Sequence, residues 1–239
     1  MPFAYRHRIA ALVAFAIPLP FAGGATAGEA VRYSLDPVHT RVMFAIEHAG
    51  FSKAIGTVSG STGQLVFDAE DWRVATLRAS VPMARVDMGD AGWNKAALAG
   101  NLLDVDDHPE AVFVSTRVEP IAPNRASVHG TLTLRGVSRE IVLDVTLNAV
   151  KRHPLPPFRR TVGFSATSML SRKAFGIDAW PSVIGDAVEL RIEAEAVRSR
   201  ADDGDDVDAN APDAPIDASS SPGAATTGAL LQTTTEPAP

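Results

Sequence analysis

Apolar and polar residues alternate through most of this chain, and the alternation is plainest in residues 128–149. A period of two is typical of a β-strand with one buried side and one solvent-facing side. The pattern begins at Val128, breaks at the turn residue Gly136, and resumes at Ile141. This segment therefore predicts an antiparallel hairpin of two half-buried strands.

The same alternation recurs along the chain and predicts an all-β fold. Between residues 90 and 104, in contrast, the apolar positions fit one stripe of a short helix. Residues 49–55 are predicted to be a connection. Eight or nine strands with turn signals at short intervals favour an antiparallel barrel or a sandwich. Beyond the hairpin, the predicted strands are residues 31–35, 39–48, 56–67, 75–83, 111–116, 162–170 and 188–196.

The two ends of the chain differ from this core. Residues 1–27 hold Arg6 and Arg8, then an apolar run and a small-residue site at Ala25 to Ala27, a pattern typical of a cleaved general secretion signal. The run is shorter than the about 20 residues of a membrane-spanning helix, so we expect no stable membrane anchor after cleavage. Residues 199–239 are rich in Asp, Ala, Pro, Ser and Thr, which predicts a disordered acidic tail. Residues 28–198 remain as one domain.

Charge and cysteine content narrow the classes of partner and chemistry. The formal net charge is −6, but from residue 201 onward the chain holds seven Asp, one Glu and neither Lys nor Arg, so the core is close to neutral. A neutral core argues against nucleic acid as a partner, because phosphate binding needs a basic patch. The absence of cysteine excludes disulfides, thiol chemistry and cysteine-ligated metals.

Candidate catalytic and metal-binding residues are few. The chain has no G-x-S-x-G nucleophile motif, no phosphate-binding glycine loop and no dinucleotide fingerprint. We therefore expect neither catalysis nor a resident metal or cofactor. A hydrolase or metalloprotein that uses His39 and His48 with nearby carboxylates is the least favoured alternative. The histidines of the core show no H-x-x-x-H zinc spacing; they are His39, His48, His108, His129 and His153.

The interior of the predicted barrel decides whether the protein binds a ligand. A barrel of about eight strands is wide enough either to be filled by its own side chains or to hold one small ligand. Small inward residues leave room for a ligand, or else they fit the taper of a filled barrel. A filled barrel would suit a structural or stress-associated interaction protein, and the pattern alone leaves both possibilities open. The small inward residues are Gly56, Gly63, Ala75, Ala79, Gly130, Ala166 and Ala194.

Five sequence blocks follow one another in a specific order between residues 33 and 196. They are YSLDPVHTRVMFAIEHAG, LLDVDDHPEAVFVS, GTLTLRGVSREIVLDVTLN, VGFSATSMLSRKAFGID and IGDAVELRIEAEA. In content and order they resemble the YceI-like family of polyisoprenoid-binding proteins of the bacterial periplasm. The resemblance implies a single lipocalin-like, eight-stranded antiparallel β-barrel with one short helix. It also implies a non-catalytic periplasmic protein, a monomer or homodimer, that binds an isoprenoid-type lipid in a hydrophobic tunnel.

Under this interpretation the inward faces of the strands and one helical residue form the tunnel wall. His48, Arg172 and Asp178 lie at predicted strand ends and are candidates for a polar mouth, with Trp180 in the following turn over the opening. The predicted wall residues are Val42, Phe44, Ile46, Leu77, Val81, Leu98, Phe113, Leu132, Leu134, Leu143, Val145, Phe164, Leu170, Phe175, Leu190 and Ile192.

The helical segment departs from the family pattern. Members commonly carry a histidine where this chain has Ala97, and two phenylalanines where it has Leu102 and Leu103. The departure puts the polar part of ligand recognition in doubt and leaves the apolar part intact.

Overall fold

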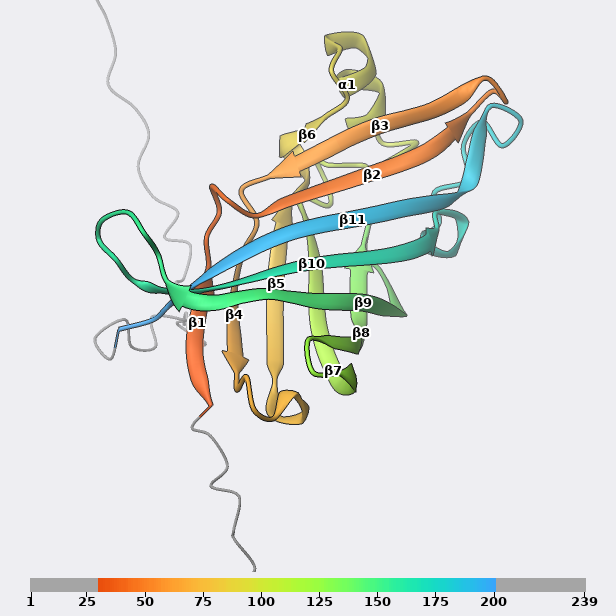
Figure 1. Cartoon of the computed structure of the whole chain (residues 1–239). Coiled ribbons are helices and arrows are strands. Elements are labelled where there is room, and N and C mark those ends of the chain that lie inside the picture. The colour runs from red at the N-terminus through yellow and green to blue at the C-terminus, as the bar shows by residue number, and fades with distance from the viewer. Residues whose placement is uncertain (1–29, 201–239) are drawn as a thin grey trace, which may run out of the picture. The chain divides into compact units, whose positions relative to one another are not determined.

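The described part of the chain, residues 30–200 of a computed structural model, is mostly β-structure (Figure 1). The predicted signal, residues 1–27, and residues 201–239 of the predicted tail lie outside the described residues. Within this part there is one α-helix, α1 (Ala91–Leu98), and no helix is long and apolar enough to cross a membrane. The strands are β1 (Val31–Leu35), β2 (Arg41–His48), β3 (Ser52–Ser59), β4 (Thr62–Phe67), β5 (Thr76–Pro82), β6 (Val86–Asp87), β7 (Glu110–Ala122), β8 (Arg125–Leu134), β9 (Val137–Arg152), β10 (Arg160–Ser171) and β11 (Ile184–Arg198).

Eight of these segments close into an antiparallel barrel. Their order around the barrel is β1, β4, β5, β7, β8, β9, β10 and β11, and β1 pairs with β11 to complete the ring. Closure gives each of these strands a hydrogen-bonded neighbour on both sides, which removes free sheet edges from the ring. The predicted eight-stranded barrel is confirmed, and the sandwich alternative is excluded.

Three of the barrel strands are broken, which is why eleven segments make eight strands. The last three residues of β11, from Ala196 to Arg198, pair with β1, and the preceding part from Ile184 to Glu193 pairs with β2. β1 and β2 are therefore two halves of one long strand that is interrupted at residues 36–40. β3 and β4 are interrupted in the same way at residues 60–61, and β5 and β6 at residues 83–85.

Beyond these breaks the sheet splits, and α1 stands at the split. β2 and β3 form a hairpin, β6 pairs with β3, and no pairing joins β6 to β7 within residues 30–200. Figure 1 shows α1 next to β6 and β3. The helix begins after Asp90, whose Oδ1 accepts a hydrogen bond from the amide of Trp93 at 3.0 Å. The side chain of Asn94 accepts a hydrogen bond from the amide of Met88 at 2.6 Å, which ties α1 to the end of β6.

Several predicted boundaries are wrong. β7, β9 and β11 extend beyond the predicted strands, and the bounds of β3 and α1 also differ. β3 begins at Ser52, so only residues 49–51 connect it to β2. The alternation is masked there because the outward-facing Ile55 is apolar yet 58% exposed. The helix ends at Leu98, and Leu102 belongs to the turns that follow, since Ala99 already has an extended backbone. The apolar stripe continued past the helix because these turns also face the interior.

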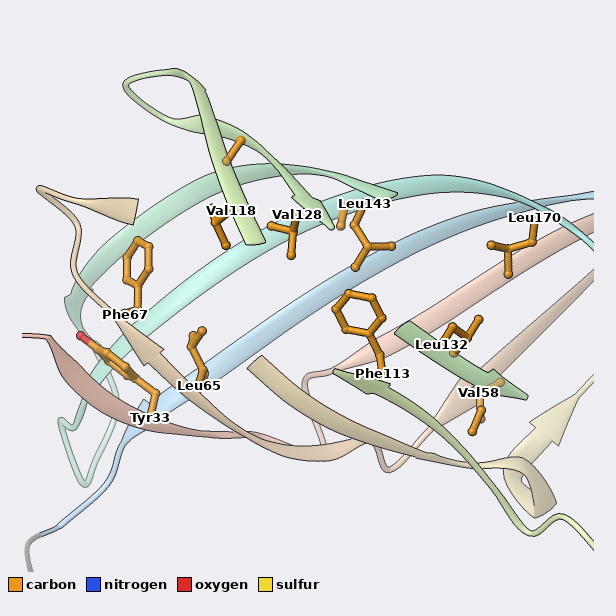
Figure 2. Close-up of a cluster of buried hydrophobic side chains, with 14 of the residues drawn as sticks. Tyr33, Val58, Leu65, Phe67, Phe113, Val118, Val128, Leu132, Leu143 and Leu170 are labelled. Atoms are coloured by element: carbon orange, nitrogen blue, oxygen red, sulfur yellow. The ribbon is translucent and has the colours of Figure 1, made fainter. Parts of the chain in front are cut away.

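One end of the barrel, where β4 leads into β5, is filled by aromatic side chains. The ring of Phe67 packs edge-to-face against Trp72 and Phe164, and both pairs of centroids are 5.3 Å apart. Figure 2 shows Tyr33, Leu65 and Phe67 together at one end of the buried cluster. All three side chains are buried, as is Trp72. We call this the sealed end.

Gly130 in β8 is expected to tolerate no side chain. A Cβ atom there would lie 2.4 Å from Cζ of Phe113 and 2.6 Å from the backbone oxygen of Val114. We expect Gly130→Ala to lower the free energy of unfolding by about 1–3 kcal/mol, the usual cost of overpacking, as measured by urea denaturation. Gly163→Ala in β10 is the matched control, because the nearest atoms lie 4.0 Å from its added Cβ. Equal losses in the two variants would contradict this account.

Candidate functional site

A cavity of about 500 Å³ lies inside the barrel. Its wall consists mainly of apolar side chains at the inward strand positions, so the barrel is hollow rather than filled. Leu98 does not line the cavity; it packs partly buried against the core, and its neighbours Ala96 and Ala97 face the cavity instead. The remaining predicted wall residues all line it: Val42, Phe44, Ile46, Leu77, Val81, Phe113, Leu132, Leu134, Leu143, Val145, Phe164, Leu170, Phe175, Leu190 and Ile192.

The space of the cavity lies in front of the inward alanines, whereas aromatic rings fill the space in front of the inward glycines Gly56 and Gly130. A Cβ at Gly56 would lie 2.3 Å from Cζ of Phe44, so the Phe44 ring already covers that glycine. The Phe113 ring covers Gly130 in the same way. Glycine lets a neighbouring ring approach the backbone, whereas alanine leaves space in front of a short side chain. The alanines that line the cavity include Ala75, Ala79, Ala166 and Ala194.

The cavity opens at the end opposite the sealed end. We call this the open end; it consists of the β2–β3 turn at residues 49–51, α1 and the β10–β11 connection at residues 172–183. Trp93, Trp180 and Val183 line the cavity here and are still 44%, 49% and 41% exposed. The ring of His48 lies 5.2 Å from that of Trp93. Two predicted mouth residues, His48 and Trp180, therefore lie at the opening.

Arg172, a third predicted mouth residue, has a different role in the structure. It is 4% exposed, and its guanidinium donates to the backbone oxygens of Gly185 at 2.7 Å, Ile177 at 2.8 Å and Ile184 at 2.8 Å. These bonds join the two ends of the β10–β11 connection. Arg172 lines the cavity, but its charged group holds this connection in place rather than standing free at the mouth.

Asp178, the fourth predicted mouth residue, is exposed and does not line the cavity. Its neighbour Ile177 is buried in the wall, so the chain turns Asp178 outward. Glu47 lines the cavity at the open end and was missed by the sequence pattern. Glu47 precedes His48 at the end of β2, where alternation predicts an outward side chain.

The segment around α1 contributes more to the wall than the sequence pattern indicated. Trp93, Ala97, Leu102 and Leu103 all line the cavity, and so does Met88 before the helix. Three of these are the positions at which the chain departs from the family pattern. Small and aliphatic residues there extend the apolar wall to the open end.

Four of the polar side chains in the wall fall into two groups: Ser61 Oγ and Trp72 Nε1 are buried without a hydrogen-bond partner in the described residues, whereas Thr40 and Ser115 bond to the barrel backbone. The hydroxyl of Thr40 donates to the backbone oxygen of Glu195 at 3.3 Å. The hydroxyl oxygen of Ser115 accepts the amide of Leu77 at 2.8 Å. The Thr40 and Ser115 hydroxyls stabilise the barrel backbone, so they present little free hydrogen-bonding capacity to a ligand.

A polar cluster of Asp36, His39 and Glu195 lies at the break between β1 and β2. Nδ1 of His39 is 2.6 Å from Oδ2 of Asp36, and this hydrogen bond is the main reason why the pKa of His39 is raised. Burial alone would raise the pKa of Asp36, but hydrogen bonds from His39 and Val38 lower it. The three side chains could surround a cation, yet the Asp36 carboxylate already accepts bonds from two backbone amides and His39. The cluster stabilises the strand break.

His39 and His48 do not form a common site. His39 lies in the break before β2, and His48 is the last residue of that strand. His39 bonds to Asp36, whereas His48 contacts Trp93 at the open end. The two histidines of the hydrolase or metalloprotein alternative are therefore at opposite ends of one strand.

Comparisons with known proteins agree with this architecture. Residues 33–196 match the family model for the YceI-like domain. A UPF0312 protein of Pseudomonas savastanoi pv. phaseolicola is 33% identical over 162 residues, which are 68% of this chain and 83% of that protein. The crystal structure of Burkholderia cenocepacia BcnA matches with a TM-score of 0.61 at 21% identity, covering 67% of this chain and 98% of that one. A polyisoprenoid binding domain from Saccharophagus degradans, implicated in plant cell wall breakdown, matches with a TM-score of 0.54 at 14% identity, covering 71% and 99%.

The family model spans nearly the whole barrel, from β1 to the carboxyl-terminal part of β11. The Pseudomonas relative aligns with 68% of the chain at 33% identity. On these matches the chain belongs to the YceI-like domain family.

Proposed function

We propose that this protein is a non-catalytic carrier that holds one amphiphilic isoprenoid, such as a polyprenyl or quinone-related lipid, inside its barrel. The observation that carries the proposal is the apolar cavity of about 500 Å³, which is sealed at one end and open at the other. This volume lies within the roughly 300–1,000 Å³ that is usual for small-molecule sites. The similarity to the polyisoprenoid binding domain of Saccharophagus degradans supports the same class of ligand.

The apolar chain of the lipid occupies the cavity, and its polar head lies at the open end. Each methylene moved from water into the cavity contributes about 0.8 kcal/mol, which is about fourfold in affinity. A chain lipid is therefore held without specific polar contacts in the barrel. His48 and Glu47 line the cavity at the open end and are placed to hydrogen-bond a head group.

The proposed carrier acts in the periplasm as a monomer or homodimer. Support for export comes from the charged, apolar and small-residue parts of residues 1–27. The cavity weighs against the filled-barrel alternative, because a structural or stress-associated interaction protein has no need of an apolar hollow. The separation of His39 from His48 weighs against a hydrolase that needs both.

Native mass spectrometry of protein recovered from the periplasm tests the proposal. We expect one lipid bound per chain, with a mass that matches an isoprenoid-type amphiphile after organic extraction. Purification without detergent prevents exchange of the lipid during the experiment. Recovery of the protein in the cytoplasm, or of protein with no lipid in the periplasm, would refute the carrier.

A further inference from the structure

Four exposed apolar side chains surround the opening of the cavity. We define the rim as Phe51, Trp93, Trp180 and Val183; Phe51 is 91% exposed, and the other three are exposed although they line the cavity. We propose that the rim docks on the surface of a zwitterionic phospholipid bilayer, so that the cavity opens directly into the lipid. This inference rests on the proposed carrier function and adds the partner from which the ligand is taken.

The rim is built from three segments that are distant in the sequence and joined by contacts. The amide of Ala49 donates to the backbone oxygen of Val183 at 2.6 Å, which links the β2–β3 turn to the β10–β11 connection. His48, at the start of the same turn, contacts Trp93 of α1. The amide of Phe51 donates to the backbone oxygen of His48 at 3.1 Å. These contacts give Phe51 and the two tryptophans a fixed place at one end of the molecule.

The rim has the chemistry of an interfacial belt. Two of the three tryptophans in the chain lie in it, and an indole combines an apolar body with one polar N–H, which suits the boundary between head groups and acyl chains. Trp180 also has a positive φ of 50°, a backbone conformation that is uncommon for a bulky residue. Its carbonyl oxygen accepts the amides of Val183 and Ile184 at 3.0 and 2.9 Å, which hold this conformation.

The charges near the rim favour a zwitterionic surface over an anionic one. Lys95 and Asp90 are both exposed at α1, and Lys173 and Asp178 are both exposed in the β10–β11 connection. Lys53, next to the β2–β3 turn, forms an ion pair with Glu189. Glu47 is also exposed at the open end. Acidic groups therefore accompany the basic ones, and the rim lacks the cluster of Lys and Arg that recognises anionic lipids.

The rim is continuous with the cavity wall. Trp93, Trp180 and Val183 contribute both to the exposed surface and to the lining, so an apolar chain passes from the rim to the interior along apolar side chains. Lipids with long apolar chains are scarcely soluble in water, because each methylene group makes transfer into water less favourable by about 0.8 kcal/mol. Contact between the open end and a bilayer removes the aqueous step from the transfer.

Vesicle flotation with the full chain and phosphatidylcholine vesicles tests the docking. We expect the protein to float with the vesicles, and brominated acyl chains to quench its tryptophan fluorescence, because Trp93 and Trp180 enter the interface while Trp72 stays at the sealed end. Phe51→Ser should weaken partitioning about tenfold, since it removes a large exposed apolar side chain. Phe51 does not line the cavity, so binding of lipid supplied from cyclodextrin should be unchanged.

Phe158→Ser is the matched control. Phe158 is 51% exposed in the β9–β10 connection, at the end of the barrel opposite the rim, and its substitution should leave partitioning unchanged. Equal effects of the two substitutions, or binding that appears only with anionic lipid and is lost in salt, would overturn the docking. If Phe51→Ser changes self-association and no variant binds vesicles, the rim is a protein interface and the proposal is wrong.

The docking and the carrier fail in distinguishable ways. Protein that carries lipid from its native compartment but never floats with vesicles would refute the docking and leave the carrier standing. Protein that floats through its rim but holds no lipid would support the docking and refute the carrier.

Discussion

Replacing Arg172 with Met is expected to lower the free energy of unfolding by about 3 kcal/mol or more, because three backbone oxygens lose their donor and each buried polar group left without a partner costs about 1–3 kcal/mol. The substitution keeps an apolar stem of similar length and removes the three hydrogen bonds to Ile177, Ile184 and Gly185. The backbone oxygen of Ile177 would remain buried without a donor and those of Gly185 and Ile184 partly buried, which is the costly part of the change. Urea denaturation of the purified protein measures the loss.

Lys173→Met is the control for this prediction. Lys173 is the next residue and is exposed, and its side chain forms no ion pair or hydrogen bond described within residues 30–200. Exposed sites of this kind usually change stability by less than about 0.5 kcal/mol. An Arg172→Met loss as small as that of the control would show that the connection at residues 172–183 holds its conformation without the guanidinium.

Partly filling the cavity is expected to weaken lipid binding strongly while the barrel still folds. Ala166 lies in the middle of β10, opposite Val145 and Ile192, and all three residues line the cavity. In Ala166→Phe the ring occupies space that three or four methylenes of the lipid would fill. At about 0.8 kcal/mol for each methylene, the affinity should fall about 100-fold. Titration of delipidated protein with a fluorescent polyprenyl analogue measures the change.

Thr167→Phe adds the same ring to the outer side of the same strand, because Thr167 is exposed. Its lipid affinity should equal that of the unaltered protein. Both variants should keep the β-sheet circular dichroism spectrum of the parent. Unchanged affinity in Ala166→Phe would place the lipid elsewhere on the protein.

Strand alternation was sufficient to predict most of the barrel. It works where an outward residue is polar, as in β8, where His129 and Thr131 flank the inward Gly130. It fails at Ile55, because an exposed apolar residue on the outer face looks the same in sequence as a buried one. The break at residues 36–40 was predicted as a turn between two strands, but the break at residues 60–61 was missed. There the inward side chains change from even-numbered positions in β3, such as Val58, to odd-numbered positions in β4, such as Leu65.

The candidate site was predicted in part for the same reason. Inward strand residues such as Leu132 and Leu190 follow from parity, and both line the cavity. The two-residue parity of strands does not apply within a helix, so Leu98 was selected where Ala97 faces the cavity. Arg172 was expected at the mouth because it lies at a predicted strand end; its three carbonyl partners are brought together only by the folded connection.

Whether the barrel is hollow could not be decided from residue size. Gly56 and Ala79 are both small and inward, yet the Phe44 ring covers the first and the cavity lies in front of the second. That difference depends on how a ring on the neighbouring strand is oriented, which a one-dimensional pattern does not contain.

Isotope-filtered nuclear Overhauser measurements on the protein with an unlabelled polyprenyl lipid test the central claim most directly. With methyl groups labelled, we predict contacts from the lipid chain to Ala166, Leu132 and Leu190 inside the barrel, and from the head group to the open end near His48. Contacts confined to outward residues such as Met169 and Val142, with none to the interior methyl groups, would contradict the account.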